Sequence, residues 1–438
     1  MQTERMSIEE RYKYLRMMQK RYREGDRKEK VGLLDEMEEV TGMHRKSLTR
    51  LMNGFVVRNR RKKERGKVYG HEVDQALKVI ARSLDYPCAE RLQPNLVWVG
   101  EILEKHGEMK MTAKVRKQLG AISVSTVRRR MKRIGVKRKT KRRKPEEANR
   151  LRRSIPTSRI AWDEQEPGHF EVDLVHHCGI SASGQYVHTL QMVDVATGWS
   201  ERAAVLGRSY LVMEDSFKHL VARIPFPILE VHPDNGSEFF NSHILKFWAE
   251  KVKEAHLSRS RPYQKNDNRF VEQKNDTLVR AYMGYRRLDT VAHTHLLGQI
   301  YDLMWVYHNF FQPVMRLQEK IPLPSTDKRL RYTRRFDQAR PPFDRLCDTH
   351  VLHEETILKL KRQRDAINPL RLRQKIYDLI DRLFSLPMAD PEIVENVYDT
   401  LERWRFDQQS EILAHHFEQA LNISSKKGEY RLVTLSIE

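Results

Sequence analysis

Three carboxylates are placed where metal-dependent chemistry could use them. Asp173 lies in the apolar run HFEVDLVHH, and its neighbours Val172 and Leu174 belong to the other face of a strand. Asp234 follows the apolar run PILEV in the turn HPDNG, and Glu272 lies near the start of the helical segment NRFVEQKNDTLVRAYM. A carboxylate inside a strand is costly unless something stabilises it. One strand centre, one strand end and one helix start can meet at one sheet edge, where three acids favour Mg²⁺ or Mn²⁺ over zinc.

The elements that must position these acids form a mixed α/β pattern. The expected elements, in chain order, are strands at residues 169–177, 185–196 and 199–206, a helix at 210–223, a short strand from 227, and helices at 242–252 and 268–283. Beyond residue 290 the chain is expected to be mostly helical, with helices at 296–311, 354–386 and 391–421 and an extended connector at 315–345. The sequence therefore predicts an α/β core between two largely helical regions.

A helix-turn-helix is predicted within residues 30–54. The first helix would direct Val31, Leu34, Met37 and Val40 inward, and a turn at residues 41–43 would lead into a second helix, residues 44–52. The second helix would present four side chains that could contact DNA: Arg45, Lys46, Thr49 and Arg50. An ordinary helical hairpin is the alternative interpretation of this segment.

A second unit of the same kind is predicted within residues 112–135. Its second helix, capped by Ser123 or Ser125, would direct Val127, Met131 and Ile134 inward. The side chains expected outside are Arg128, Arg129, Arg130, Lys132 and Arg133. A basic run follows and is expected to be an arm that tracks phosphates, through Lys137, Arg138, Lys139, Lys141, Arg142, Arg143 and Lys144.

The charge is concentrated in the first third of the chain. The 438 residues carry a net charge of +22; residues 1–153 hold 43 basic and 20 acidic residues, and the remainder hold 38 and 39. Charge confined to one segment indicates a nucleic-acid partner rather than a merely solubilising surface. The three cysteines form no CxxC pair, the first residues lack an apolar signal core, and no apolar run is long enough to span a bilayer. We therefore expect a cytoplasmic protein with no membrane partner.

The acidic motifs and their surroundings resemble a known family. The stretches GHFEVDLVHH, TLQMVDVATGWSE, HPDNGSEFFN, SRPYQKNDNRFVEQKN and GYRR are similar to those of DDE transposases of bacterial insertion sequences, members of the retroviral-integrase-like superfamily. The resemblance covers residues 160–290, and YHNFFQP at 307–313 extends it. Between Asp234 and Glu272 there are 37 residues, close to the family's habitual spacing.

The resemblance implies a ribonuclease-H-like core with Asp173, Asp234 and Glu272 as catalytic and metal-binding residues. It also implies a transposase that nicks element ends and joins the freed 3′-hydroxyl to target DNA by phosphoryl transfer with two Mg²⁺ (or Mn²⁺) ions. The partners would be double-stranded DNA, in a bacterial nucleoid, and further copies of the chain. No nucleotide cofactor is expected, because GxxxxGK[ST] does not occur. The expected domains are 1–66 and 67–136, both helix-turn-helix, a basic linker at 137–159, the core at 160–290 and a helical region at 291–438.

Several alternatives remain open at this point. Asp194 could be taken for the second carboxylate, although the resemblance favours a non-catalytic role, and Glu171 shares the face of Asp173 and could assist it. His176 and His177 could be ligands, but strand-end packing is the preferred interpretation. A DNA-binding regulator with an inactive integrase-like domain would share the basic segment, and a structure-specific nuclease would share the fold.

Overall fold

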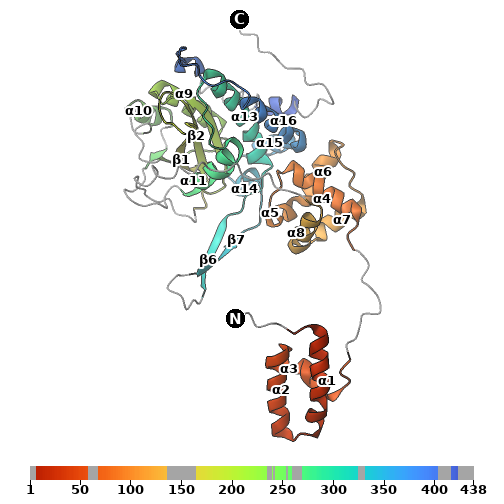
Figure 1. Ribbon diagram of the computed structural model, residues 1–438. Coiled ribbons are helices and arrows are strands. Elements are labelled where there is room, and N and C mark those ends of the chain that lie inside the picture. Colours follow the sequence, from red (N-terminus) through yellow and green to blue (C-terminus); the bar gives the residue numbers. More distant parts are fainter. Residues whose placement is uncertain are drawn as a thin grey trace. The chain divides into compact units, whose positions relative to one another are not determined.

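The computed structural model describes residues 6–57, 68–135, 164–233, 239, 242–252, 255–258, 269–323, 331–402 and 416–422. The chain divides into two compact units, Met1–Val68 and Tyr69–Glu438, each with its own apolar core. Figure 1 labels the helices and strands of both units. No helix in these ranges is both long and apolar enough to cross a membrane.

The N-terminal unit consists of three helices, α1 (Ile8–Glu24), α2 (Arg27–Thr41) and α3 (Arg45–Asn53). Ser7 and Asp26 each begin a helix with a reciprocal capping box, which satisfies backbone N–H groups of the first turn. Gly42, at φ 64°, ends α2 in the left-handed conformation that favours glycine. Leu15 of α1 and Leu48 of α3 are fully buried in the core of this unit.

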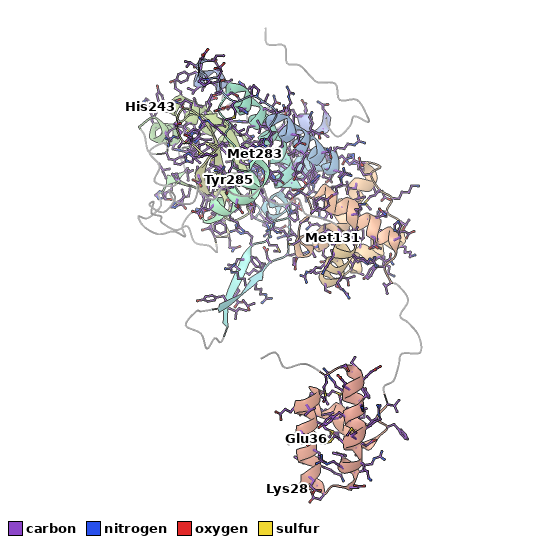
Figure 2. The ribbon with its side chains drawn as sticks, in the orientation of Figure 1. Lys28, Glu36, Met131, His243, Met283 and Tyr285 are labelled. Carbon is purple, nitrogen blue, oxygen red and sulfur yellow. The ribbon has the colours of Figure 1, made fainter. Side chains whose placement is uncertain are left out.

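The predicted apolar stripe of α2 is only half correct. Leu34 and Met37 are buried, but Val31 and Val40 are 50% and 41% exposed, and Leu33 is buried. α1, which was not predicted from the sequence, packs on both α2 and α3. It therefore determines which face of α2 is buried. α1 and α2 are also joined at the surface, where the Tyr14 hydroxyl donates to Glu36 of α2 at 3.0 Å. Figure 2 labels Glu36. Burial raises the pKa of Tyr14 to about 12.

Five helices open the second unit: α4 (His71–Ser83), α5 (Ala89–Leu92), α6 (Leu96–Lys105), α7 (Ala113–Ala121) and α8 (Val124–Arg133). The predicted cap of α8 is confirmed, since the Ser123 hydroxyl accepts from the Thr126 N–H at 3.3 Å. These helices share one continuous core with the rest of the unit.

A buried joint fastens α4 to the later helices α13 (Val291–Phe310) and α16 (Pro369–Leu383). Asp85, just after α4, accepts from Arg373 at 2.6 and 2.9 Å and from the Tyr377 hydroxyl at 3.0 Å. The Tyr307 hydroxyl donates to the Ser83 carbonyl at 2.8 Å. Asp85 has φ 58°, a conformation that its hydrogen bonds must stabilise.

The centre of the second unit is a five-stranded mixed sheet in the order β3-β2-β1-β4-β5. Its strands are β1 (His169–His176), β2 (Val187–Asp194), β3 (Ser200–Leu206), β4 (Glu230–Pro233) and β5 (His256–Leu257). β2 is antiparallel to both β1 and β3, whereas β4 is parallel to β1 and β5 is parallel to β4. This arrangement is consistent with the ribonuclease-H-like core that the resemblance implies.

Helices pack on the sheet and carry its connections. α9 (Tyr210–Arg223), predicted at these bounds, and α13 both contact β3, and α10 (Ser242–Lys251) contacts α9. The predicted helix at 268–283 is present but not uniform: α11 (Arg269–Lys274) continues into a π-helical segment, Asn275–Arg280, and then α12 (Ala281–Met283). π-Helical turns occur often at functional sites.

A charged pair is buried where α9 meets β3. Glu201 and Arg223 are fully buried, and their side chains meet at 2.9 Å. The indole N–H groups of Trp199 and Trp305 donate to the second oxygen of Glu201 at 2.8 and 2.6 Å. Burial raises the pKa of Glu201, while Arg223 and the two indoles oppose that shift. The carboxylate therefore depends on a complete set of partners.

Two predictions for the C-terminal region are wrong. The expected connector at 315–345 contains a hairpin, β6 (Leu317–Leu323) and β7 (Arg331–Phe336), followed by α14 (Pro342–Cys347). α15 (Glu354–Asp365) and α16 follow as expected, but residues 391–402 form turns and the short 3₁₀ helix Val397–Thr400. Ile393 and Val394, expected on an apolar helix face, are 65% and 93% exposed. Residues 416–422 are helical.

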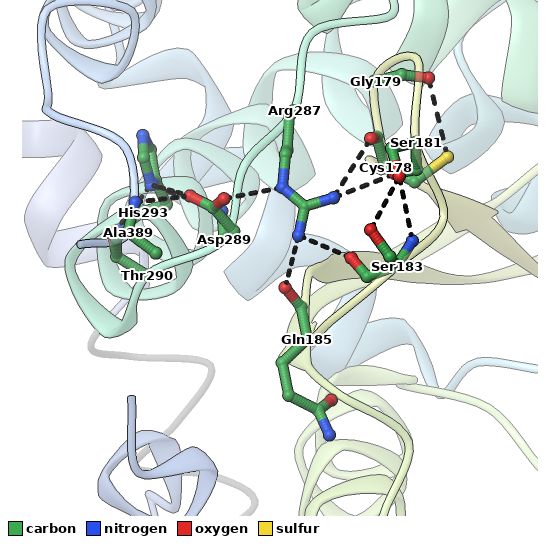
Figure 3. Close-up of polar contacts among 10 residues, drawn as sticks. All are labelled: Cys178, Gly179, Ser181, Ser183, Gln185, Arg287, Asp289, Thr290, His293 and Ala389. Atoms are coloured by element: carbon green, nitrogen blue, oxygen red, sulfur yellow. Dashed lines mark hydrogen bonds and ion pairs between the residues drawn. The ribbon is translucent and has the colours of Figure 1, made fainter. Parts of the chain in front are cut away.

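Arg287, in the GYRR stretch, holds the connection between β1 and β2 (Figure 3). Its guanidinium donates to the carbonyls of Ser181 and Ser183, both at 2.9 Å, and of Gln185 at 3.1 Å, and it pairs with Asp289 at 2.7 Å. The planar fork of arginine is needed to reach several carbonyls at once. Arg287 is therefore a positioning residue for this connection.

Replacing Arg287 by lysine is expected to loosen the connection at residues 179–185. A single ammonium group cannot replace the fork, so cleavage of this segment by a nonspecific protease should become at least about tenfold faster. Mass spectrometry of subtilisin fragments would measure the change. Arg286→Lys is the matched control, since Arg286 lies over the Phe384 ring, and equal cleavage of both variants would contradict the role assigned to Arg287.

Candidate active site

Asp173 occupies the middle of β1, opposite Gln191 of β2. Val172 and Leu174, on either side, are buried, whereas Asp173 is half-buried. One oxygen of its carboxylate accepts from the Leu174 N–H at 2.8 Å. The alternation predicted from the sequence is therefore present, with the acid on the face opposite its two apolar neighbours.

Glu171 lies two residues earlier on β1 and binds the start of α11. The side chain is fully buried, and one of its oxygens accepts from the backbone N–H groups of Phe270 at 2.8 Å and Val271 at 2.9 Å. A carboxylate is well suited to this position, because the first N–H groups of a helix lack partners and carry partial positive charge. Glu171 thus fixes the first turn of α11 to the central strand.

A second link joins the same two elements one turn further on. The side-chain amide of Asn275 donates to the carboxylate of Asp173. Glu272 lies in the sequence between these two attachment points, and its side chain is exposed. It precedes Asn275 by three residues, a spacing that makes two residues neighbours on the surface of a helix. The structure thus brings the element that carries Glu272 onto the strand that carries Asp173.

Asp234 lies outside the described residues. β4 runs parallel to β1, and its last residue, Pro233, is aligned with Val172. Pro233, the residue before Asp234, therefore lies at the same level of the sheet as Val172, the residue before Asp173.

Several basic side chains lie around Lys274 of α11. Burial, together with Arg91, Arg202, Arg316 and Arg345, lowers the pKa of Lys274 to about 7. Its ammonium group donates to the Gly198 carbonyl at 3.3 Å. Lys274 and Arg91 line a cavity of about 180 Å³, to which α11, the π-helical segment after it, the end of α13 and the segment that follows α13 all contribute.

Asp194 has a structural role. One of its oxygens accepts from the Gly168 N–H at 2.9 Å, and the other accepts from the Thr197 N–H at 2.7 Å and the Thr197 hydroxyl at 2.6 Å. Burial raises the pKa of Asp194, against the effect of these hydrogen bonds. The acid shapes the turn between β2 and β3, in agreement with the non-catalytic role expected for it.

His177 is buried and forms a hydrogen bond with Thr189 at 2.7 Å, as expected for a packed strand-end histidine.

The candidate DNA-binding side chains of α3 divide into two kinds. Lys46 and Arg50 are exposed, whereas Arg45 and Thr49 are half-buried. Arg45 pairs with Asp35 of α2, and the Thr49 hydroxyl donates to the Arg45 carbonyl at 3.0 Å. Lys46 and Arg50 are therefore the more accessible pair.

On α8, one prediction is wrong and four residues lie at the surface. Arg130 was expected outside, but its side chain is 11% exposed and bonds Asp74 and the Tyr69 carbonyl, because α4 packs against that side of α8. Arg128 and Arg133 are exposed and pair with Glu90 and Asp74. The remaining exposed candidates are Arg129 and Lys132. The basic run expected to track phosphates, Lys137, Arg138, Lys139, Lys141, Arg142, Arg143 and Lys144, lies outside the described residues.

Replacing Glu171 by alanine is expected to reduce metal-dependent activity by about 10²-fold, because the start of α11, and with it Glu272, would lose its attachment to β1. Glu171→Gln keeps an accepting oxygen and should lose much less. The Mg²⁺ concentration for half-maximal activity should rise for the alanine variant and return toward the normal value for the glutamine variant. Equal losses in both variants, with no change in Mg²⁺ dependence, would contradict a positioning role.

The order and direction of the strands are consistent with a ribonuclease-H-like α/β core. No family model matches the chain. The chain is 34% identical over 343 residues to the uncharacterized protein y4rM of Sinorhizobium fredii (strain NBRC 101917 / NGR234). This alignment covers 78% of this chain and 96% of y4rM. It belongs to the same family as y4rM.

Solved structures with local similarity include the catalytic core domain of BIV integrase. That alignment has a TM-score of 0.24 and 17% identity, and it covers 32% of this chain and 83% of the integrase chain. A chain from the simian T-cell lymphotropic virus intasome in complex with the PP2A regulatory subunit B56 gamma aligns with a TM-score of 0.23 and 12% identity, over 40% of this chain and 56% of that one.

Proposed function

We propose that this protein is a DNA transposase that nicks the ends of a mobile element and joins the freed 3′-hydroxyl groups to target DNA. The attachment of α11 to β1 supports this most directly. Glu171 binds the first turn of α11, and Asn275 binds Asp173, so the helix that carries Glu272 is anchored on both sides of that residue. This attachment supports a shared role for the two acids.

Asp173, Asp234 and Glu272 would hold two Mg²⁺ ions. Their oxygen ligands match the preference of this cation, and the half-buried Asp173 and exposed Glu272 lie on elements that contact each other. When bound, the ions activate the attacking water or 3′-hydroxyl and stabilise the departing oxygen. Glu171 and Asn275 keep the acidic residues in register. Exchange of one phosphodiester for another is nearly balanced in energy, so no nucleotide cofactor is required.

Recognition of the element ends would come from the two helical units. α3, with Lys46 and Arg50, and α8, with Arg129 and Lys132, would contact DNA as the second helices of helix-turn-helix units. Metal-dependent cleavage has little base preference, so sequence specificity must come from such helices. Two ends must attack one target, which requires at least two copies of the chain on DNA.

A cleavage and strand-transfer assay on DNA that carries the terminal sequences of the corresponding element tests the proposal. The expected result is a Mg²⁺-dependent nick at the 3′ end followed by a joined product, both absent for Glu272→Gln, which should bind the same DNA normally. If the protein binds the ends specifically but neither Mg²⁺ nor Mn²⁺ produces a nick, the chain is a DNA-binding regulator and the proposal is wrong. Cleavage that follows DNA structure rather than terminal sequence would identify a nuclease.

A further inference from the structure

A cluster of two histidines and a carboxylate lies away from the candidate active site. His219 belongs to α9, Asp302 to α13, and His416 to the helical segment 416–422. The nearest nitrogens of His219 and His416 lie 3.8 and 4.0 Å from the same oxygen of Asp302. One ligand atom from each of the three lies within 4.8 Å of the other two, and within the described ranges this is the one such group of His, Cys, Asp and Glu side chains.

The cluster is closed off from solvent by the packing around it. His219 and His416 are 7% and 2% exposed, and the Asp302 side chain is 18% exposed. The His416 ring lies 5.8 Å from the Trp305 ring, and Phe417, the next residue, packs on Phe310 with ring centroids 5.0 Å apart. The C-terminal helical segment therefore docks on α13 at this point.

Other side chains orient two of the three potential ligands. His219 directs Nε2 toward Asp302, and its other ring nitrogen, Nδ1, lies 3.6 Å from a carboxylate oxygen of Glu402. Arg223 donates to Asp302 at 2.8 Å. A carboxylate behind a ligating histidine, on the nitrogen that does not bind metal, is the usual support of a metal site, since it fixes the tautomer and the ring.

The described charged side chains around the cluster are mostly acidic. Arg202 and Arg223 lie there together with four carboxylates, those of Glu201, Asp215, Asp302 and Glu402.

We propose that His219, Asp302 and His416 bind a structural Zn²⁺ ion that fastens the C-terminal segment to α9 and α13. Zinc is favoured over Mg²⁺ because two of the three ligands are imidazole nitrogens. Ligand atoms about 2.0–2.1 Å from a tetrahedral zinc are about 3.4 Å apart. The histidine-to-aspartate separations of 3.8 and 4.0 Å thus need to close by about half an ångström, and the separation of the two histidines, within 4.8 Å, by at most about 1.4 Å, which side-chain rotation can supply. Glu402 then acts as the positioning residue for His219.

Metal analysis of the purified full-length protein tests this inference. After dialysis against metal-free buffer, mass spectrometry should find about one Zn²⁺ per chain, and replacement by Co²⁺ should give visible absorption typical of tetrahedral nitrogen and oxygen ligands. His219→Gln and His416→Gln should each lose most of the zinc and the cobalt spectrum. Two controls should retain both: His188→Gln, another buried histidine, and Asp173→Asn, in the candidate active site.

A second measurement separates metal binding from simple folding defects. Zn²⁺ added back to the chelator-treated protein should slow proteolysis C-terminal to Glu402 at least about tenfold, and the two cluster variants should show no such protection. Absence of zinc from the normal protein, together with no cobalt spectrum, overturns the inference, and so does equal zinc content in the cluster and control variants. This outcome is independent of the transposase proposal, which concerns Asp173, Asp234 and Glu272.

Discussion

Replacing Asp173 by asparagine is expected to lower the rate of metal-dependent DNA cleavage by about three orders of magnitude or more, which corresponds to ~4 kcal/mol of transition-state stabilisation. The substitution preserves the shape of the side chain on β1 and removes the charge that would hold the metal ions. Single-turnover assays with radiolabelled element ends would measure nicking and strand transfer separately. Both should be lost, while the melting temperature and binding to the ends should change little.

The matched control is Asp194→Asn. Asp194 is fully buried and bonds the turn that follows β2, so its replacement should cost some stability but leave the chemistry of folded molecules much less affected. If Asp173→Asn retained near-normal turnover, Asp173 would be removed from the catalytic set. If instead the folded Asp194→Asn protein were inactive, the choice of acids would be wrong.

Replacing Arg223 by methionine is expected to lower the free energy of unfolding by about 3–5 kcal/mol, the largest effect on stability that we expect from a single substitution. The change leaves Glu201 fully buried with two indole donors but without its counter-charge. Urea denaturation followed by tryptophan fluorescence would measure it, because Trp199 and Trp305 contact Glu201 directly.

A second substitution identifies the cause of that loss. Adding Glu201→Gln to Arg223→Met removes the uncompensated charge and should restore at least ~1 kcal/mol. Arg129→Met on α8 is the surface control and should change the free energy of unfolding by less than about 0.5 kcal/mol. A loss for Arg223→Met no larger than for Arg129→Met would show that the buried pair does not hold α9 to β3.

The sequence predicted elements well where local signals agree. α9 was predicted at its observed bounds because its residues have a helical pattern, and in the structure Ser209 caps its start. The alternation around Asp173 likewise identified β1. The buried face of α2 was predicted wrongly because it depends on packing with α1. Of the helix expected at 391–421, the described residues 391–402 are not an α-helix, although Ile393, Val394 and Val397 have helical spacing.

Residues whose role depends on distant partners were harder to recognise. Glu171 could be placed on the face of Asp173 from the period of a strand, but its hydrogen bonds to α11 join residues about 100 positions apart. Arg130 was expected outside because α8 was interpreted without α4. His219, Asp302 and His416 come from three separate segments, so no spacing in the sequence indicates their cluster.

The joint at Asp85 has a consequence for the spacing between the DNA sequence that is recognised and the phosphodiester that is cut. Hydrogen bonds from Arg373 and Tyr377 tie the end of α4 to α16, and the Tyr307 hydroxyl ties it to α13. α8 packs on α4, and α13 packs on the central sheet. In the proposed transposase the position of α8 would then fix the number of base pairs between the sequence that α8 binds and the phosphodiester that is cut. Inserting one base pair between them would move the cut by ~3.4 Å and turn it by about 35° around the duplex, out of reach of Asp173.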